Sequence, residues 1–403
     1  MRTKGFSLSK IFFLIGVTSL ALIYIALWTK MILSPTERTG TDFIAFYTAG
    51  RVSQEHGIQN AYNIIFQQDV QESLLGFSLL DNQPLLYNHL PFLIPILILL
   101  TQESYAFSFF LWVLIQIVLY GLGFYIINQL FKKTRKENTN RKILISSALF
   151  FPIFISLLLG QDTAFLFLGF SLFTYGILSK NDILTGIGLT LATVRPHLAL
   201  ALALPLFFKN KKAFAYFLGF SGILALFSVA VLGIEGTKNF VQILTISSNG
   251  AWYGMKEDAM FNLIGILVRI FPSSNINIIH IVGWSAYLFA IIFISISWKR
   301  TETLKEEHLN TAIILSLFFA PHLHFHDLSL LIIPTLSILS SRKISATQEN
   351  LALIPLGMSF LLIFTQPVSL LYYSLPYLLM LLLIIFTQRE TKIHKNTNSF
   401  PSV

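Results

Sequence analysis

The chain has 403 residues, with 28 Lys and Arg, 19 Asp and Glu, and no cysteine. Hydrophobic residues make up 54% and charged residues 12%, and the mean hydropathy is +0.70. So few charges cannot cover a water-soluble surface, which excludes a soluble enzyme and a disordered chain. The missing cysteines exclude structural disulfides and thiolate metal sites. The net charge of +9 comes from bases at the ends of apolar runs, which indicates a membrane partner and no nucleic acid.

Charge-free apolar runs predict the membrane-spanning segments, since about 20 apolar residues cross a bilayer as a helix. We therefore expect an all-α polytopic membrane protein that forms a single integral membrane domain, 1–403. The first run follows a basic start, so a signal peptide is the alternative to a retained span. The runs predict about twelve crossings, some of them short, at 11–30, 88–102, 105–130, 143–159, 163–179, 183–208, 213–233, 276–298, 309–322, 325–341, 350–366 and 369–387.

Basic residues predict the orientation of the chain, because they favour the cytoplasmic side. They place both termini, including the tail 388–403, in the cytoplasm of a multi-pass protein of the bacterial inner (plasma) membrane. The opposite, extracytoplasmic face then receives a first loop, 32–88, a second loop, 234–275, and the short stretch 321–327. The first loop mixes apolar and polar residues, which is typical of interfacial helices.

The segment from Lys132 to Lys142 holds six bases, but counting the predicted spans in order places it on the extracytoplasmic side. Either it breaks the rule or 88–102 is a re-entrant half-span, with a second break at Arg195-Pro196 to restore parity. The sequence leaves both versions open.

Asp42 is the first candidate for chemistry. It follows the first span and has the aromatic neighbours Phe43, Phe46 and Tyr47. Apolar surroundings raise the pKa of a carboxyl group, which suits a general base. The alternative is structural, with Thr41 or Asp42 capping a helix that begins at Phe43.

Arg195 is the one formal charge between Asp182 and Lys209. A cation at membrane depth usually faces a cavity or a partner. With Pro196 and His197 beside it, its forked donors suit a phosphate. The alternative is a snorkelling side chain or a structural pair, with Asp162 as the mate.

Three histidines, His322, His324 and His326, precede Asp327. Metal binding is conceivable, but no zinc-binding spacing is present, so we expect no metal and hydrogen bonding to a phosphate or sugar. Interfacial histidines without a role are the alternative.

Two weaker patterns complete the set. Gln161 and Asp162 follow Gly160 at a polar break, which is either a site or a turn. Trp252, with Tyr253 and Met255 beside it, either stacks on a sugar or belongs to the aromatic belt.

Taken together, the order of these motifs resembles glycosyltransferase family 87, the polyprenyl-phosphate-mannose-dependent transferases, over roughly residues 35–335. The matching motifs are Gly40-Thr41-Asp42-Phe43 with Phe46-Tyr47, Ala49-Gly50, Gly57 and Ala61-Tyr62; Gly160-Gln161; Gly186, Gly188 and Arg195-Pro196; and Pro321 to Asp327-Leu328. The family often has Gln-Asn at 161–162, Lys-Pro at 195–196 and Tyr-Pro-Pro near Tyr87, so the donor lipid or sugar can differ.

The resemblance implies a GT-C-like helical bundle that moves a sugar, mannose or another hexose, from a polyprenyl phosphate to a hydroxyl of a lipid or glycan acceptor, with inversion and no cofactor. It makes Asp42 the base. Arg195, His197, His324 and His326 then bind the donor phosphate, and Tyr47, Gln161, Asp162, Trp252 and Asp327 contact the sugar or acceptor.

The alternatives are a transporter or lipid flippase, a lipid-linked oligosaccharide ligase, and a structural membrane protein. Against a transporter, no matched interrupted helices appear in two halves of the sequence.

Overall fold

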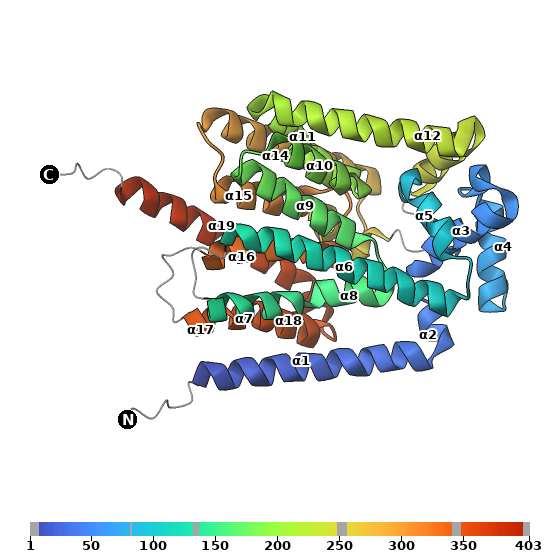
Figure 1. The fold of residues 1–403 in the computed structure, drawn as a ribbon, viewed down its shortest axis with the longest axis horizontal. Helices are drawn as coiled ribbons and strands as arrows, with labels where there is room; N and C mark the ends of the chain where they lie inside the picture. The colour runs from blue at the N-terminus through green and yellow to red at the C-terminus, as the bar shows by residue number, and fades with distance from the viewer. Residues whose placement is uncertain (1–7, 81–82, 132–136, 248–255, 341–347, 398–403) are drawn as a thin grey trace.

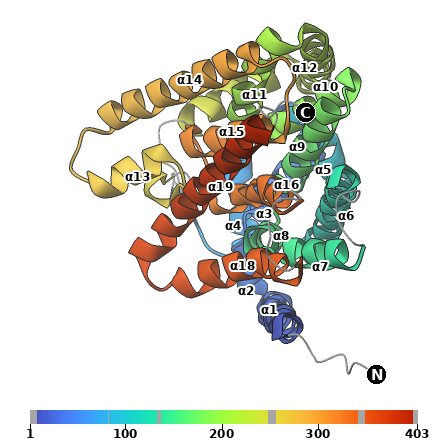
Figure 2. The same ribbon diagram turned by 90° about the vertical axis from the view of Figure 1, so that its left-hand side faces the viewer.

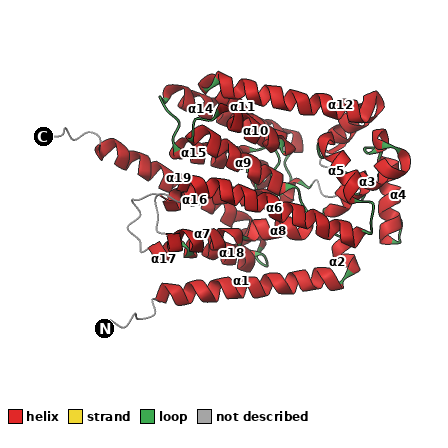
Figure 3. Cartoon of the chain, in the orientation of Figure 1, coloured by secondary structure: helices red, strands yellow, loops and turns green. Residues whose placement is uncertain are grey.

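The computed structural model describes residues 8–80, 83–131, 137–247, 256–340 and 348–397. Within these ranges the chain forms helices and loops and no strand (Figure 3), so the expected all-α class is confirmed. The helices are α1 (Leu8–Leu33), α2 (Pro35–Thr39), α3 (Phe43–His56), η1 (Ile58–Asn60), α4 (Ile64–Leu75), η2 (Pro91–Leu93), α5 (Ile94–Leu100), α6 (Tyr105–Phe131), α7 (Glu137–Ala148), α8 (Phe151–Leu159), α9 (Thr163–Leu178), α10 (Asp182–Leu191), η4 (Ala192–Val194), α11 (Pro196–Lys209), α12 (Lys211–Ser247), η5 (Glu257–Ala259), α13 (Leu263–Ile270), α14 (Ile276–Arg300), α15 (Glu306–Phe319), η6 (Phe325–Leu331), α16 (Ile332–Ser340), α17 (Gln348–Leu351), α18 (Leu353–Thr365) and α19 (Ser369–Thr397).

Five of the described helices, α1, α6, α12, α14 and α19, are long and apolar enough to cross a membrane. A sixth span results if α7 and α8, which meet at a bend of 42°, count as one. The expected count of about twelve is therefore not confirmed. Several apolar runs that look like spans in the sequence form helices of 10–17 residues, because loops or bends interrupt them before they reach the width of a bilayer.

The two termini lie at one end of the bundle, and α2, α3, α4 and α5 lie at the other (Figure 1). Helix α6 leads back from that second end, and α7 begins near the termini. This path agrees with the alternative in which 88–102 is re-entrant. In that alternative α6 brings the chain back to the same end of the bundle as the two termini, and the basic segment follows there. Helix α1 stands at the margin of the bundle, beside α18 (Figure 2).

The loop expected at 234–275 begins as a helix. Helix α12 continues to Ser247 across a kink at Gly233, where φ is +66°. This positive φ favours glycine. The helical backbone is broken at Gly233, and the chain changes direction there before a second helical stretch runs on to Ser247. The short helices η5 and α13 follow, and α14 then returns toward the termini.

Helix α10 packs closely on α9 through a glycine contact. A Cβ atom at Gly188 would lie 2.3 Å from the backbone nitrogen of Phe173 and 2.6 Å from the carbonyl oxygen of Gly169. Gly188 is one of the motif positions named above, and its role in the fold is this close approach of two backbones.

We expect Gly188→Val to destabilise the folded protein, since the added side chain would push α9 and α10 apart by overpacking. The matched control is Gly219→Ala in α12, where a Cβ meets nothing within 4 Å. Thermal unfolding in detergent should show a lower Tm for the valine variant and an unchanged or slightly higher Tm for the control. An unchanged Tm in Gly188→Val would contradict the packing described here.

Candidate active site

Three interruptions between helices meet around one cluster of polar side chains. They are the turn 160–162 between α8 and α9, Arg195 between η4 and α11, and the loop 320–324 between α15 and η6. The backbone N–H and C=O groups at a helix end have no hydrogen-bond partner within the helix. Such breaks are therefore places where a buried polar site can form in an apolar bundle. Asp42, directly before α3, completes the cluster.

The Asp42 carboxylate points to Gln161 and does not cap α3. Its side chain makes no capping hydrogen bond within the described residues, and Gln161 Nε2 donates to Asp42 Oδ2 at 2.6 Å. Gly160 makes this approach possible, since its φ is +68° and a Cβ there would lie 2.7 Å from Phe43 Cβ. The indole of Trp112 donates to the carbonyl oxygen of Gly160 at 2.8 Å and holds the turn.

Arg195 ties the three interruptions together. Its guanidinium lies 3.0 Å from Asp162 Oδ1 and 3.4 Å from Asp327 Oδ1. It also donates from Nη2 to Gln161 Oε1 at 3.4 Å. The pairing with Asp162 is the one named in the structural alternative above, and Arg195 also lines the cavity described below. Two hydrogen bonds orient the amide of Gln161, because its oxygen accepts from Arg195 and its nitrogen donates to Asp42.

His89 also contacts this cluster. Its Nδ1 lies 2.8 Å from Asp162 Oδ2, so the carboxylate of Asp162 is engaged on both oxygens. Burial alone would raise the pKa of Asp162, but the charges of Arg195 and His89 hold that pKa well below its usual range. Asp162 is therefore an anion that stabilises the cluster.

The histidines form a row beside Arg195. The ring centroids of His322 and His324 are 4.4 Å apart, and those of His324 and His326 are 5.6 Å apart. Burial and the neighbouring His326 lower the pKa of His324 to about 4, against the opposing charges of Asp327 and Asp42. Burial likewise lowers the pKa of His322 well below its usual value. Near neutral pH, His322 and His324 are thus uncharged hydrogen-bonding groups.

These side chains line a cavity of about 760 Å³, a size typical of small-molecule sites. Its polar wall consists of Asp42, Asn88, His89, Gln161, Arg195, His197, His322, His324 and His326. The Nε2 atom of His197 has no hydrogen-bond partner within the described part of the chain.

Not every predicted site residue reaches this cavity. Asp162 and Asp327 are fully buried behind Arg195 and are not among the cavity-lining residues. Asp327 instead accepts a hydrogen bond from the backbone N–H of His324 at 3.2 Å. Tyr47 lies apart, with its hydroxyl donating to the carbonyl oxygen of Glu103 at 3.4 Å. Trp252, Tyr253 and Met255 lie outside the described residues.

His89 was not predicted from the sequence, and neither was a second polar pair, Glu257 with His280, which is hydrogen-bonded at the same cavity. His89 carries no motif that marks it, and its partner Asp162 is 73 residues away. Glu257 and His280 belong to a loop and to an apolar span, which gave no reason to connect them.

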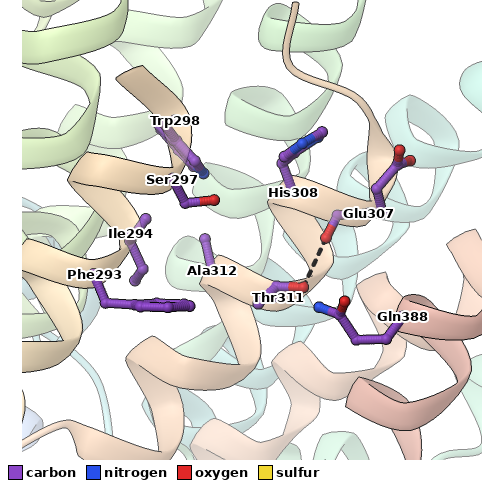
Figure 4. Close-up of a pocket in the computed structure, with 9 residues that line it drawn as sticks. All are labelled: Phe293, Ile294, Ser297, Trp298, Glu307, His308, Thr311, Ala312 and Gln388. Atoms are coloured by element: carbon purple, nitrogen blue, oxygen red, sulfur yellow. Dashed lines mark hydrogen bonds between the residues drawn. The ribbon is translucent and has the colours of Figure 1, made fainter. Parts of the chain in front are cut away.

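A second, smaller cavity of about 150 Å³ lies between α14, α15 and α19, around Trp298, Glu307 and His308 (Figure 4). Thr311 Oγ1 donates to the carbonyl oxygen of Glu307 at 2.8 Å there. This cavity is far too small for a sugar with its carrier, so the large cavity is the candidate active site.

Comparison with known protein families identifies the chain. The model of glycosyltransferase family 87 matches residues 88–321, which is more than half of the sequence. The chain belongs to glycosyltransferase family 87. No curated protein and no solved structure shows a significant match.

Membership of glycosyltransferase family 87 makes this membrane protein a glycosyltransferase. The matched region includes His89, Gln161 and Arg195, whereas Asp42 and the loop after Pro321 lie outside it. In the structure, the two segments outside the match both contact the matched region. The Gln161 amide contacts the Asp42 carboxylate, and the Arg195 guanidinium contacts Asp327.

Proposed function

We propose that this glycosyltransferase moves a sugar, mannose or another hexose, from a polyprenyl-phosphate carrier to a hydroxyl of a lipid or glycan acceptor on the extracytoplasmic face of a bacterial plasma membrane. The observation that supports this most directly is the cavity in which a carboxylate, Asp42, faces a row of hydrogen-bonding histidines. The resemblance to polyprenyl-phosphate-dependent transferases supplies the donor class. The place of Asp42, directly before α3 at the end of the bundle opposite the termini, supports the extracytoplasmic side.

Asp42 is the proposed general base. It takes the proton of the acceptor hydroxyl while the acceptor oxygen bonds to the anomeric carbon of the donor sugar. The bond from that carbon to the phosphate oxygen breaks, and its electron pair leaves with the polyprenyl phosphate. A single displacement of this kind inverts the anomeric carbon and needs one base opposite the leaving group. Gln161 holds the carboxylate of that base in place.

The phosphate that leaves gathers negative charge, which hydrogen-bond donors in a desolvated site stabilise. We assign this task to the N–H groups of His197, His324 and His326 together with Arg195. The two carboxylates beside Arg195 offset much of its charge, so the histidines are needed as further hydrogen-bond donors. The unpartnered Nε2 atom of His197 fits this role.

The test uses the purified full-length protein in lipid nanodiscs. It is supplied with radiolabelled polyprenyl-phosphate mannose or, separately, with a radiolabelled sugar nucleotide, and with a lipid extract as acceptor. We expect label to pass to the acceptor from the lipid-linked donor alone, with inversion of the anomeric configuration. Transfer from the sugar nucleotide would contradict the proposed donor. Transbilayer movement of the labelled lipid in proteoliposomes, without transfer, would support a flippase instead.

A further inference from the structure

The large cavity has a second polar wall, on helices other than those beside the histidine row. It is formed by Glu257 in η5 and by His280 and Trp284 in α14. Glu257 Oε1 and His280 Nε2 are hydrogen-bonded, and their side chains are 14% and 28% exposed. The pair is therefore reachable from the cavity and is not used by the proposed displacement.

Helix α14 sets the distance between the two walls. His280 and Trp284 are four residues apart and lie on one face of the helix, and Tyr287 follows one turn further along. The hydroxyl of Tyr287 donates to the carbonyl oxygen of His197 at 2.5 Å, which fixes this turn beside the first wall. The seven residues from Tyr287 to His280 rise about 10 Å. His280 therefore lies about 10 Å along α14 from the turn that contacts His197.

The segment that follows Glu257 is hydrogen-bonded to the histidine loop. The backbone N–H of Phe261 donates to the carbonyl oxygen of Leu323 at 2.9 Å, and Asn262 Nδ2 donates to that of Ala320 at 2.7 Å. Arg269 donates to the carbonyl oxygen of Met260 at 2.9 Å. A polar pair on such a support is preorganised for a ligand.

The chemistry of this wall excludes a phosphate and favours hydroxyl groups. A carboxylate repels an anion in a cavity of low dielectric, whereas a carboxylate and an imidazole together accept and donate hydrogen bonds to neighbouring hydroxyls. Trp284 is half exposed and offers an apolar ring face with a polar edge. These groups match the face and hydroxyls of a sugar.

We propose that Glu257, His280 and Trp284 form a subsite for a carbohydrate acceptor. The hydroxyl that reaches Asp42 then belongs to a glycan or glycolipid, and not to a plain alcohol. This inference rests on the proposed function, since it names the class of its acceptor.

The test measures binding without turnover. The full-length protein in nanodiscs is titrated with radiolabelled octyl mannoside or with octan-1-ol of the same chain length. We expect the wild type to bind the glycoside more tightly than the alcohol. Glu257→Gln and His280→Gln should each weaken glycoside binding about tenfold, the size of one lost hydrogen bond to a charged group. Glu235→Gln, an exposed acid in α12, is the control and should bind as the wild type does.

Kinetics provide the second readout. With a lipid-linked donor and the glycoside as acceptor, Glu257→Gln should raise the acceptor KM and leave the donor KM unchanged. Equal binding of octan-1-ol and octyl mannoside, no binding by the wild type, or an effect of Glu257→Gln on the donor KM alone would overturn the subsite. A wild type that binds the glycoside through Glu257 but takes no sugar from a polyprenyl phosphate would refute the proposed function and leave the subsite standing.

Discussion

Asp42→Asn is expected to lower the rate of sugar transfer by about 10²–10⁴-fold, the range typical of a lost general base. The folded yield should stay the same, because asparagine keeps an oxygen that can accept the hydrogen bond from Gln161. The carboxylate is the one feature removed, so the loss should appear in kcat while the donor KM changes little. Initial rates with a radiolabelled lipid-linked sugar, measured at saturating donor, check this.

The control for this variant is Asp69→Asn. Asp69 lies on α4, in the same segment between α1 and α5, and is exposed. It should retain wild-type activity, which would show that lost charge in this segment is not itself harmful. Full activity of Asp42→Asn would show that Asp42 is not the general base.

Arg195→Ala is expected to fail at an earlier stage, in folding. Removing the guanidinium leaves Asp162 and Asp327 fully buried without their partner. Breaking a buried ion pair in this way costs about 3–5 kcal/mol, a large share of the stability of a typical protein. We expect little monodisperse protein by size-exclusion chromatography after detergent extraction.

A compensated variant separates structure from donor binding. Arg195→Met combined with Asp162→Asn and Asp327→Asn removes the charges together, which is far less costly than removing one alone. We expect this triple variant to regain most of the folded yield and still transfer no sugar, since the orientation of Gln161 and the cation are lost. If it folds and transfers at the wild-type rate, Arg195 has no part in the reaction.

The sequence carried enough information to single out three polar residues of the main cluster. Asp42, Gln161 and Arg195 each stood out as polar residues in or beside apolar runs, where polar side chains are costly and usually functional. The resemblance to the family added their order along the chain. The structure then brings the three together, as their separate positions in the sequence could not show by themselves.

Apart from the Arg195–Asp162 pair, the contacts between distant segments could not be predicted. Asp162 and Asp327 were expected to contact the sugar or the acceptor, yet tertiary packing buries both behind Arg195. Tyr47 looked like part of the site because it neighbours Asp42, but helical geometry turns it toward Glu103. The expected number of spans is not confirmed, because apolar composition does not reveal where a run is broken, as at Arg195 between η4 and α11.

The shortness of α9 bears on where the reaction takes place. This helix has 16 residues and is therefore about 24 Å long, whereas the hydrocarbon layer is about 30 Å thick. One end carries the polar turn before α10, and the other carries the Gln161–Asp162 turn at the cavity. If the turn before α10 lies at one edge of the hydrocarbon layer and α9 runs along the membrane normal, the Gln161–Asp162 turn stops several ångströms short of the other edge. In that arrangement the proposed lipid-linked donor would meet its acceptor at the cavity without its chain leaving the acyl region, and a thicker bilayer would place the reacting carbon further from water.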